Sequence, residues 1–128
     1  MSYYFAKKIK GSFEEVERKV YASLKEEGFG VLTEIDVQDT LKKKLDVDFR
    51  KYKILGACNP TFAYRALLAE DKIGIMLPCN VIIQEVGAGE VEVAAVDPIA
   101  SMSAVENEGL HELATLVQTK LRSVVDVL

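Results

Sequence analysis

The sequence has few of the residues that build metal centres and no long apolar run. It contains two cysteines and one histidine among 128 residues, whereas a structural zinc site needs four such ligands at short paired spacings. No apolar run approaches the ~18 residues of a membrane span. There is no basic tail and the net charge is −4, so nucleic-acid binding lacks an electrostatic basis. We therefore expect no metal, no membrane and no nucleic acid.

Familiar catalytic and nucleotide-binding motifs are absent as well. The chain has no G-x-G-x-x-G, no Walker loop and no H-E-x-x-H. A nucleophile paired with an imidazole base would have to use His111. Nothing in the sequence places His111 beside a nucleophile, and we expect it to face solvent near the start of the last helix. The sequence therefore assigns no catalytic residue and no cofactor, and leaves open whether the protein is an enzyme.

Linkers, repeats and low-complexity segments are also missing. A length of 128 residues with 49% hydrophobic residues fits one domain, which commonly has about 100–150 residues. We expect residues 1–128 to form a single domain. No basic segment precedes a long apolar stretch near the N-terminus, so a secretory signal is not expected. Two cysteines without such a signal favour reduced thiols and a cytoplasmic location.

Capping residues and apolar periodicity predict four helices. Ser12 and Glu15 form a capping box for a first helix that ends before Gly28. Asp36 caps a short second helix over about 37–45. Asn59 and the proline after it are typical of the N-cap and first position of a third helix, over about 60–70. A closing helix begins near residue 103 or 105 and carries a wide apolar stripe.

Five apolar or alternating runs predict strands, at about 3–9, 31–35, 52–57, 81–86 and 90–96. A further extended segment is expected at 73–77. Gly87-Ala88-Gly89 predicts a hairpin between the last two strands. The resulting order, β-α-β-α-β-α-β-β-α, indicates an α+β fold with a mixed sheet and helices packed against it.

The most distinctive pattern is a doubled Cys-Asn unit, formed by Cys58-Asn59 and Cys79-Asn80. Each unit contains one of the two cysteines and lies beside a proline, where an apolar run meets a structural boundary. The helix after Pro60 runs about 16 Å, and the extended return toward Cys79 covers about 20 Å. These lengths nearly cancel if the two segments are antiparallel, which would bring both units to one edge of the sheet.

Two interpretations of these units remain open. The N-terminus of the third helix would favour a thiolate at Cys58 or bind an anion such as a carboxylate or phosphate. With Asn59, Cys79 and Asn80 nearby, the four residues would form a small-ligand or thiol-redox site. In the other interpretation Cys58 is a small buried hydrophobe that ends a strand, and the units are structural.

These segments also resemble a known family. The run 52–60, followed by Ala63, Ala66, the run 77–81 and Asp97-Pro98, is similar to the bacterial and archaeal domain-of-unknown-function family numbered 302. The similarity extends from about residue 7 to residue 124. The resemblance implies an α+β domain with helices on one side of a sheet, similar to the TATA-binding-protein-like class. It also implies a homodimer, and it implies no reaction.

The sequence thus supports two hypotheses about function. The first is a regulatory, redox or small-molecule-binding site at Cys58, Asn59, Cys79 and Asn80. The second is a non-catalytic homodimeric interaction module. The consecutive apolar residues at 81–83 favour the dimer independently, because they suggest a strand that is covered on both faces.

Overall fold

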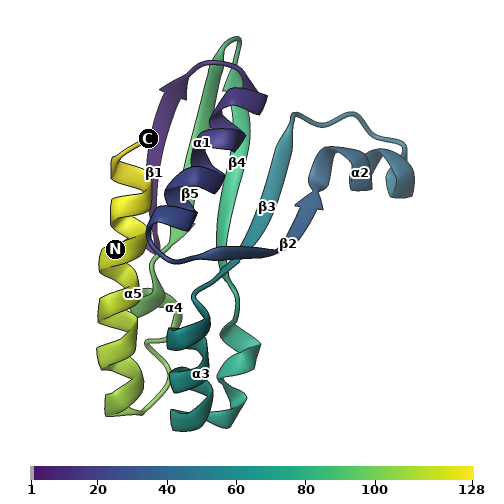
Figure 1. Ribbon diagram of the computed structural model, residues 1–128. Coiled ribbons are helices and arrows are strands. Elements are labelled where there is room, and N and C mark those ends of the chain that lie inside the picture. Colours follow the sequence, from purple (N-terminus) through teal and green to yellow (C-terminus); the bar gives the residue numbers. More distant parts are fainter. Residues whose placement is uncertain (1) are drawn as a thin grey trace.

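A five-stranded sheet with the strand order β1-β5-β4-β3-β2 forms the centre of the computed structural model, which describes residues 2–128 (Figure 1). The strands are β1 (Tyr4–Lys10), β2 (Gly30–Asp36), β3 (Tyr52–Cys58), β4 (Cys79–Gly87) and β5 (Glu90–Val96). Each of these four strand pairings is antiparallel. The predicted α+β class is therefore confirmed, with an antiparallel sheet rather than a mixed one.

The helices lie on one side of the sheet and beyond one of its ends (Figure 1). They are α1 (Phe13–Glu26), α2 (Val37–Leu45), α3 (Pro60–Ala69), the 3-10 helix η1 (Asp71–Met76), α4 (Pro98–Ser101) and α5 (Glu108–Asp126). The two long helices, α1 and α5, cover the sheet, while α3 and η1 lie beyond the end where β3 leaves it. Helix α2 projects past the β2 edge and contains no buried residue.

The predicted helix starts are confirmed by their caps. The Ser12 side chain accepts a hydrogen bond from the Glu15 backbone N–H at 3.1 Å. The Asn59 side chain accepts from the Phe62 N–H at 3.4 Å, with proline following it as the first helical residue. Gly28 ends the turn after α1 with a φ of 84°, a conformation that glycine adopts without a steric cost. Local side-chain chemistry therefore fixes these boundaries.

The segment between α3 and β4 differs from its prediction. The extended segment expected at 73–77 is wrong, because Asp71–Met76 form the helix η1. Ile73 is fully buried there, so this short helix places one apolar side chain in the core. The distance argument that relied on an extended return therefore does not describe the path of the chain.

The start of the closing helix also differs from the prediction. Helix α5 begins at Glu108, because the Asn107 side chain caps it by accepting from the Leu110 N–H at 3.2 Å. The residues before it form α4, in which Pro98 takes the first helical position after the Asp97 cap. The sequence analysis did not predict a helix at Pro98.

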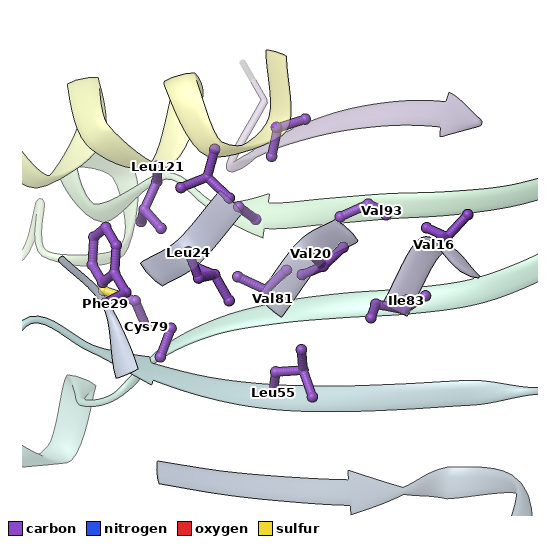
Figure 2. Close-up of a cluster of buried hydrophobic side chains, with 14 of the residues drawn as sticks. Val16, Val20, Leu24, Phe29, Leu55, Cys79, Val81, Ile83, Val93 and Leu121 are labelled. Atoms are coloured by element: carbon purple, nitrogen blue, oxygen red, sulfur yellow. The ribbon is translucent and has the colours of Figure 1, made fainter. Parts of the chain in front are cut away.

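A sheet core lies between the strands and the two long helices (Figure 2). Val16, Val20 and Leu24 of α1 face the strands, and Leu121 enters from α5. The buried members of the sheet core are Phe13, Val16, Val20, Leu24, Phe29, Leu55, Ala57, Cys79, Val81, Ile83, Val91, Val93, Ala95, Leu121, Val124 and Val125.

A second group of buried side chains, the end core, lies beyond the sheet between α3, η1 and the N-terminal half of α5. Its members are Ala66, Ile73, Met102, Leu110, Leu113 and Ala114. Helix α5 contributes to both cores, so one continuous helix joins them. Leu116 of α5 is exposed and belongs to neither core.

The second face of the sheet is not covered by the long helices. Alternation along β4 turns Val81 and Ile83 toward the sheet core, where both are fully buried, and turns Ile82 to the opposite face, where it is half-buried. Tyr4, Tyr52 and Ile82 line a hollow of about 460 Å³ on that face, together with the polar side chains of Gln84 and Glu92. We call this surface the open sheet face. Among residues 2–128, none of the helices is long and apolar enough to span a membrane.

Candidate functional site

A cavity of about 290 Å³ lies at the junction of the two cores. Phe29, Ala57 and Cys79 of the sheet core form one side, and Ala66 and Leu110 are among the end-core residues that form the other. We call it the thiol-lined cavity. Its wall consists of Phe29, Leu32, Ala57, Cys58, Asn59, Phe62, Ala63, Ala66, Leu67, Leu77, Pro78, Cys79, Pro98, Met102, Leu110, Leu113, Ala114 and Val117.

The two cysteines meet at this cavity from neighbouring strands. Ala57 of β3 is paired with Cys79 of β4, so Cys58 is one residue beyond the pair. Both side chains contribute to the cavity wall, and both thiols are free. Cys58 is half-buried, whereas Cys79 is only 8% exposed and lies beside Phe29 at one end of the sheet core (Figure 2).

The environment of Cys79 keeps its thiol protonated. Burial, with a smaller contribution from the nearby Cys58 sulfur, raises the pKa of Cys79 to about 11. An anion in this apolar setting would lose its hydration without a compensating charge. At neutral pH Cys79 is therefore a neutral thiol, and such a thiol is a weak hydrogen-bond donor rather than a nucleophile.

The two asparagines have separate positions. Asn59 lies on the cavity wall and also caps α3. Asn80 pairs with Gly56 and is exposed in the hollow of the open sheet face. Asn80 does not contribute to the cavity wall, because the alternation along β4 turns its side chain to the open sheet face. The structure thus brings together three of the four predicted site residues, Cys58, Asn59 and Cys79.

The polarity of the cavity is very low. No charged side chain contributes to its wall, and its polar groups are the two thiols and the Asn59 amide. Two residues on the wall are exposed, Leu32 at 68% and Leu67 at 43%, so the cavity reaches the molecular surface. A space of this kind can accept hydrocarbon and offers nothing to neutralise a charged group.

The sequence did not indicate the contribution of α4 and α5 to the site. Leu110, Leu113, Ala114 and Val117 line the cavity from α5, and Met102 follows α4. Their spacing indicates an apolar helix face, and the same spacing is typical of any helix that packs on a core. No signal in the sequence distinguishes a wall residue from a core residue here.

His111 lies outside the cavity. Its side chain is exposed, as predicted, and its Nε2 atom lies 2.6 Å from the Val105 carbonyl oxygen. This contact ties the first turn of α5 to the loop before it. Within residues 2–128 no group of three or more His, Cys, Asp or Glu side chains is placed to hold a metal ion.

Comparison with known proteins gives the family of the chain. Residues 5–128 match the family described as "Domain of unknown function DUF302". The chain belongs to the DUF302 family. The resemblance drawn from the paired Cys-Asn segments is therefore confirmed, and it extends over nearly the whole of this chain.

A solved DUF302 structure has the same fold. The crystal structure of an uncharacterized conserved DUF302 protein from Bacillus stearothermophilus has a TM-score of 0.90 to this chain, with 27% sequence identity. The match covers 98% of each chain. No curated protein gives a significant match. These matches establish the family and the fold of the chain, and neither of them names an activity.

Proposed function

We propose that this DUF302 domain binds a small, neutral, apolar molecule in the thiol-lined cavity. The observation that carries the proposal is a space of about 290 Å³ with almost entirely hydrocarbon walls, two of whose residues, Leu32 and Leu67, are exposed. The volume is close to the lower limit of small-molecule sites, which occupy about 300–1,000 Å³.

The energetics favour an apolar occupant. Side chains around an unfilled space lose dispersion contacts, and apolar cavities of about half this volume bind benzene or xenon. A ligand that fills the space would also remove its own apolar surface from water, at roughly 25 cal/mol per Å². A water molecule in the cavity would be poorly stabilised, because it requires two to four polar partners and the wall offers only the thiols and Asn59.

The absence of charge on the wall defines the ligand class further. A carboxylate or phosphate in the cavity would lose its hydration without meeting a cation, since no lysine, arginine or histidine contributes to the wall. This argues against the anion suggested by the helix N-terminus. We therefore propose an uncharged ligand with a hydrocarbon body.

Toluene and benzoate test this proposal as a matched pair, because they have similar rings and differ in charge. Toluene should raise the melting temperature by a few degrees when its concentration greatly exceeds its Kd, and benzoate should leave it unchanged. Ala63→Phe places a ring in the cavity and should abolish the toluene shift. Ala22→Phe, on the exposed face of α1, is the control that should retain it. The proposal would be refuted if toluene raised the melting temperatures of Ala63→Phe and Ala22→Phe equally. It would also be refuted if benzoate stabilised the wild type as much as toluene does.

The open sheet face supports a second candidate function, a homodimeric interaction module. Tyr4 and Tyr52 surround half-buried Ile82 there, without cover from the long helices. An apolar surface of this kind is typical of interaction sites, and a second copy of the chain would bury it symmetrically. We also propose that residues 1–128 act as one domain, with its reduced thiols in the cytoplasm.

Light scattering at micromolar concentration tests the dimer. We expect twice the chain mass of 14.2 kDa, and Ile82→Lys should reduce the mass to that of the monomer. Leu68→Lys, at an exposed position on α3, is the matched control that should remain dimeric. A wild-type protein that is monomeric would exclude this candidate and leave the cavity proposal untouched.

A further inference from the structure

The wall of the thiol-lined cavity contains two thiols, Cys58 and Cys79. Cys79 is more than nine-tenths buried, and within residues 2–128 its thiol forms no hydrogen bond. A buried thiol donor that contributes to the wall of an apolar cavity can meet an acceptor on a ligand there. Cys58 lies on the same wall and is half-buried, so an occupant of the cavity can reach its sulfur.

We propose that Cys58 captures neutral α,β-unsaturated aldehydes and ketones with a hydrocarbon tail, by covalent addition inside the thiol-lined cavity. The inference rests on the proposed binding of apolar molecules and names the substrate class of that site. The hydrocarbon tail occupies the space between the two cores. The unsaturated carbonyl group lies at the thiol end of the cavity.

The structure favours Cys58 over Cys79 as the nucleophile. The thiolate is the reactive form of cysteine, and burial disfavours it at Cys79, where the pKa is raised to about 11. Cys58 is more exposed and directly precedes Asn59, the N-cap of the ten-residue helix α3. Its greater exposure lets a molecule in the cavity approach the Cys58 sulfur.

The addition needs no further reactant. The Cys58 thiol first gives its proton to water, and its sulfur then forms a bond to the β-carbon of the unsaturated carbonyl compound. The electron pair of the carbon–carbon double bond moves to the α-carbon and carbonyl oxygen as an enolate. A proton from water then adds at the α-carbon, so the adduct equals thiol plus ligand and no group leaves.

The protonated Cys79 thiol has a separate role in this step. Its S–H can donate to the carbonyl oxygen of the bound ligand, where negative charge develops during the addition. Cys79 would thus be a polarising residue and Cys58 the residue that forms the bond. This assignment explains why two thiols with such different burial lie on the same wall.

The test uses trans-2-hexenal as the probe and intact-protein mass as the readout, after borohydride reduction to trap the adduct. After both thiols are reduced with dithiothreitol and the reductant is removed, the wild type should gain one probe as a thiol adduct, whose mass exceeds that of a reduced lysine imine by one water. Cys58→Ser should gain no thiol adduct. Cys79→Ala should still gain one probe at a lower rate. Adduct formation that is unchanged in Cys58→Ser would overturn the proposal.

A preference measurement separates capture in the cavity from ordinary thiol reactivity. The rate ratio of hexenal to acrylamide should exceed the ratio for free glutathione by on the order of tenfold, since only hexenal has a hydrocarbon tail. Ala63→Phe should bring the ratio down to that of glutathione. Leu67→Trp, at the exposed part of the wall, is a second obstructing variant if Ala63→Phe fails to fold. A ratio that neither folded variant lowers would overturn the inference.

The saturated aldehyde hexanal distinguishes failure of the capture from failure of the binding proposal. If hexanal and toluene stabilise the protein while hexenal forms no adduct, the covalent step is refuted and binding stands. If neither stabilises the protein and no adduct forms, both proposals fail. If hexanal stabilises the protein and hexenal labels Cys58 alone, both are supported.

Discussion

The Ser23 hydroxyl of α1 donates a 2.8 Å hydrogen bond to the backbone carbonyl oxygen of Val124 in α5. Ser23 is the one buried polar side chain in the core of the described chain, and the two residues are separated by 101 positions. The bond therefore fixes the two long helices to each other above the sheet. It does so at a point where apolar packing alone would permit a shift along the helix axes.

Ser23→Ala should lower the free energy of unfolding by about 1 kcal/mol, because a buried hydrogen bond contributes ~0.5–1.5 kcal/mol. Urea denaturation followed by circular dichroism measures the change. Ser123→Ala, at a half-buried position on α5, is the matched control and should change stability by less than half as much. Equal effects would mean that the bond to Val124 contributes nothing specific.

Asn59→Ala should destabilise the protein more than Asn80→Ala. Asn59 caps α3 through the Phe62 N–H, and loss of such a cap costs ~0.5–2 kcal/mol. Its 3.4 Å length favours the lower part of that range. Asn80 is exposed on the open sheet face, so its loss should change little. Thermal unfolding of the two variants compares them directly, and equal losses would contradict this view of the two Cys-Asn units.

Gly56→Ala should destabilise the protein by about 1–3 kcal/mol, the usual cost of overpacking. A Cβ atom at this position would lie 2.7 Å from Pro78 Cγ and would overlap Thr33 Oγ1. Thr33→Gly removes one of these contacts, so the double variant should recover part of the loss. Denaturant titration of both variants measures the recovery. A stable Gly56→Ala protein would show that β2 and the turn before β4 yield more easily than the geometry suggests.

The raised pKa of Cys79 predicts a specific loss of stability in alkali. The pKa rises from a reference of 9.0 to about 11 on folding, so the folded state holds the thiol proton more tightly than the unfolded state. This contribution is fully present below pH 9 and is lost as the pH rises through 11. The total contribution of this proton to the free energy of unfolding is on the order of 2–3 kcal/mol.

Cys79→Ala removes this contribution, so the wild type should lose more stability than the variant between pH 8 and pH 10.5. Urea denaturation at a series of pH values gives the difference, which cancels the titration of lysines and tyrosines common to both proteins. Cys58→Ala is the control and should keep the alkaline loss. Parallel curves for the wild type and Cys79→Ala would mean that Cys79 ionises freely in the folded protein.

Local chemistry made much of the fold predictable. Ser12, Asp36 and Asn59 each begin a helix at the expected residue, because a cap is a contact between neighbours in the sequence. The segment at η1 was mispredicted because a short apolar run fits a strand and a buried turn equally well. The helical conformation of this segment depends on the burial of Ile73 in the end core, which is a tertiary contact.

The candidate site was predictable only in part. The meeting of Cys58 and Cys79 depends on the antiparallel pairing of β3 with β4, which the repeated pattern suggested but did not determine. The place of Asn80 could have been anticipated, since it follows Cys79 within one strand and therefore points to the other face. The contribution of α5 was not predictable, because Leu110 and Leu113 lie far along the chain and resemble any core residues.

The continuity of α5 has a consequence for how the protein opens. Leu110 and Leu113 belong to the end core, while Leu121 and Val124 belong to the sheet core. Neither core can release the helix without weakening the other, so amide protons in both halves of α5 should exchange with solvent in one cooperative event. A molecule seated between the cores would then slow exchange along the entire helix, including amides far from the point of contact.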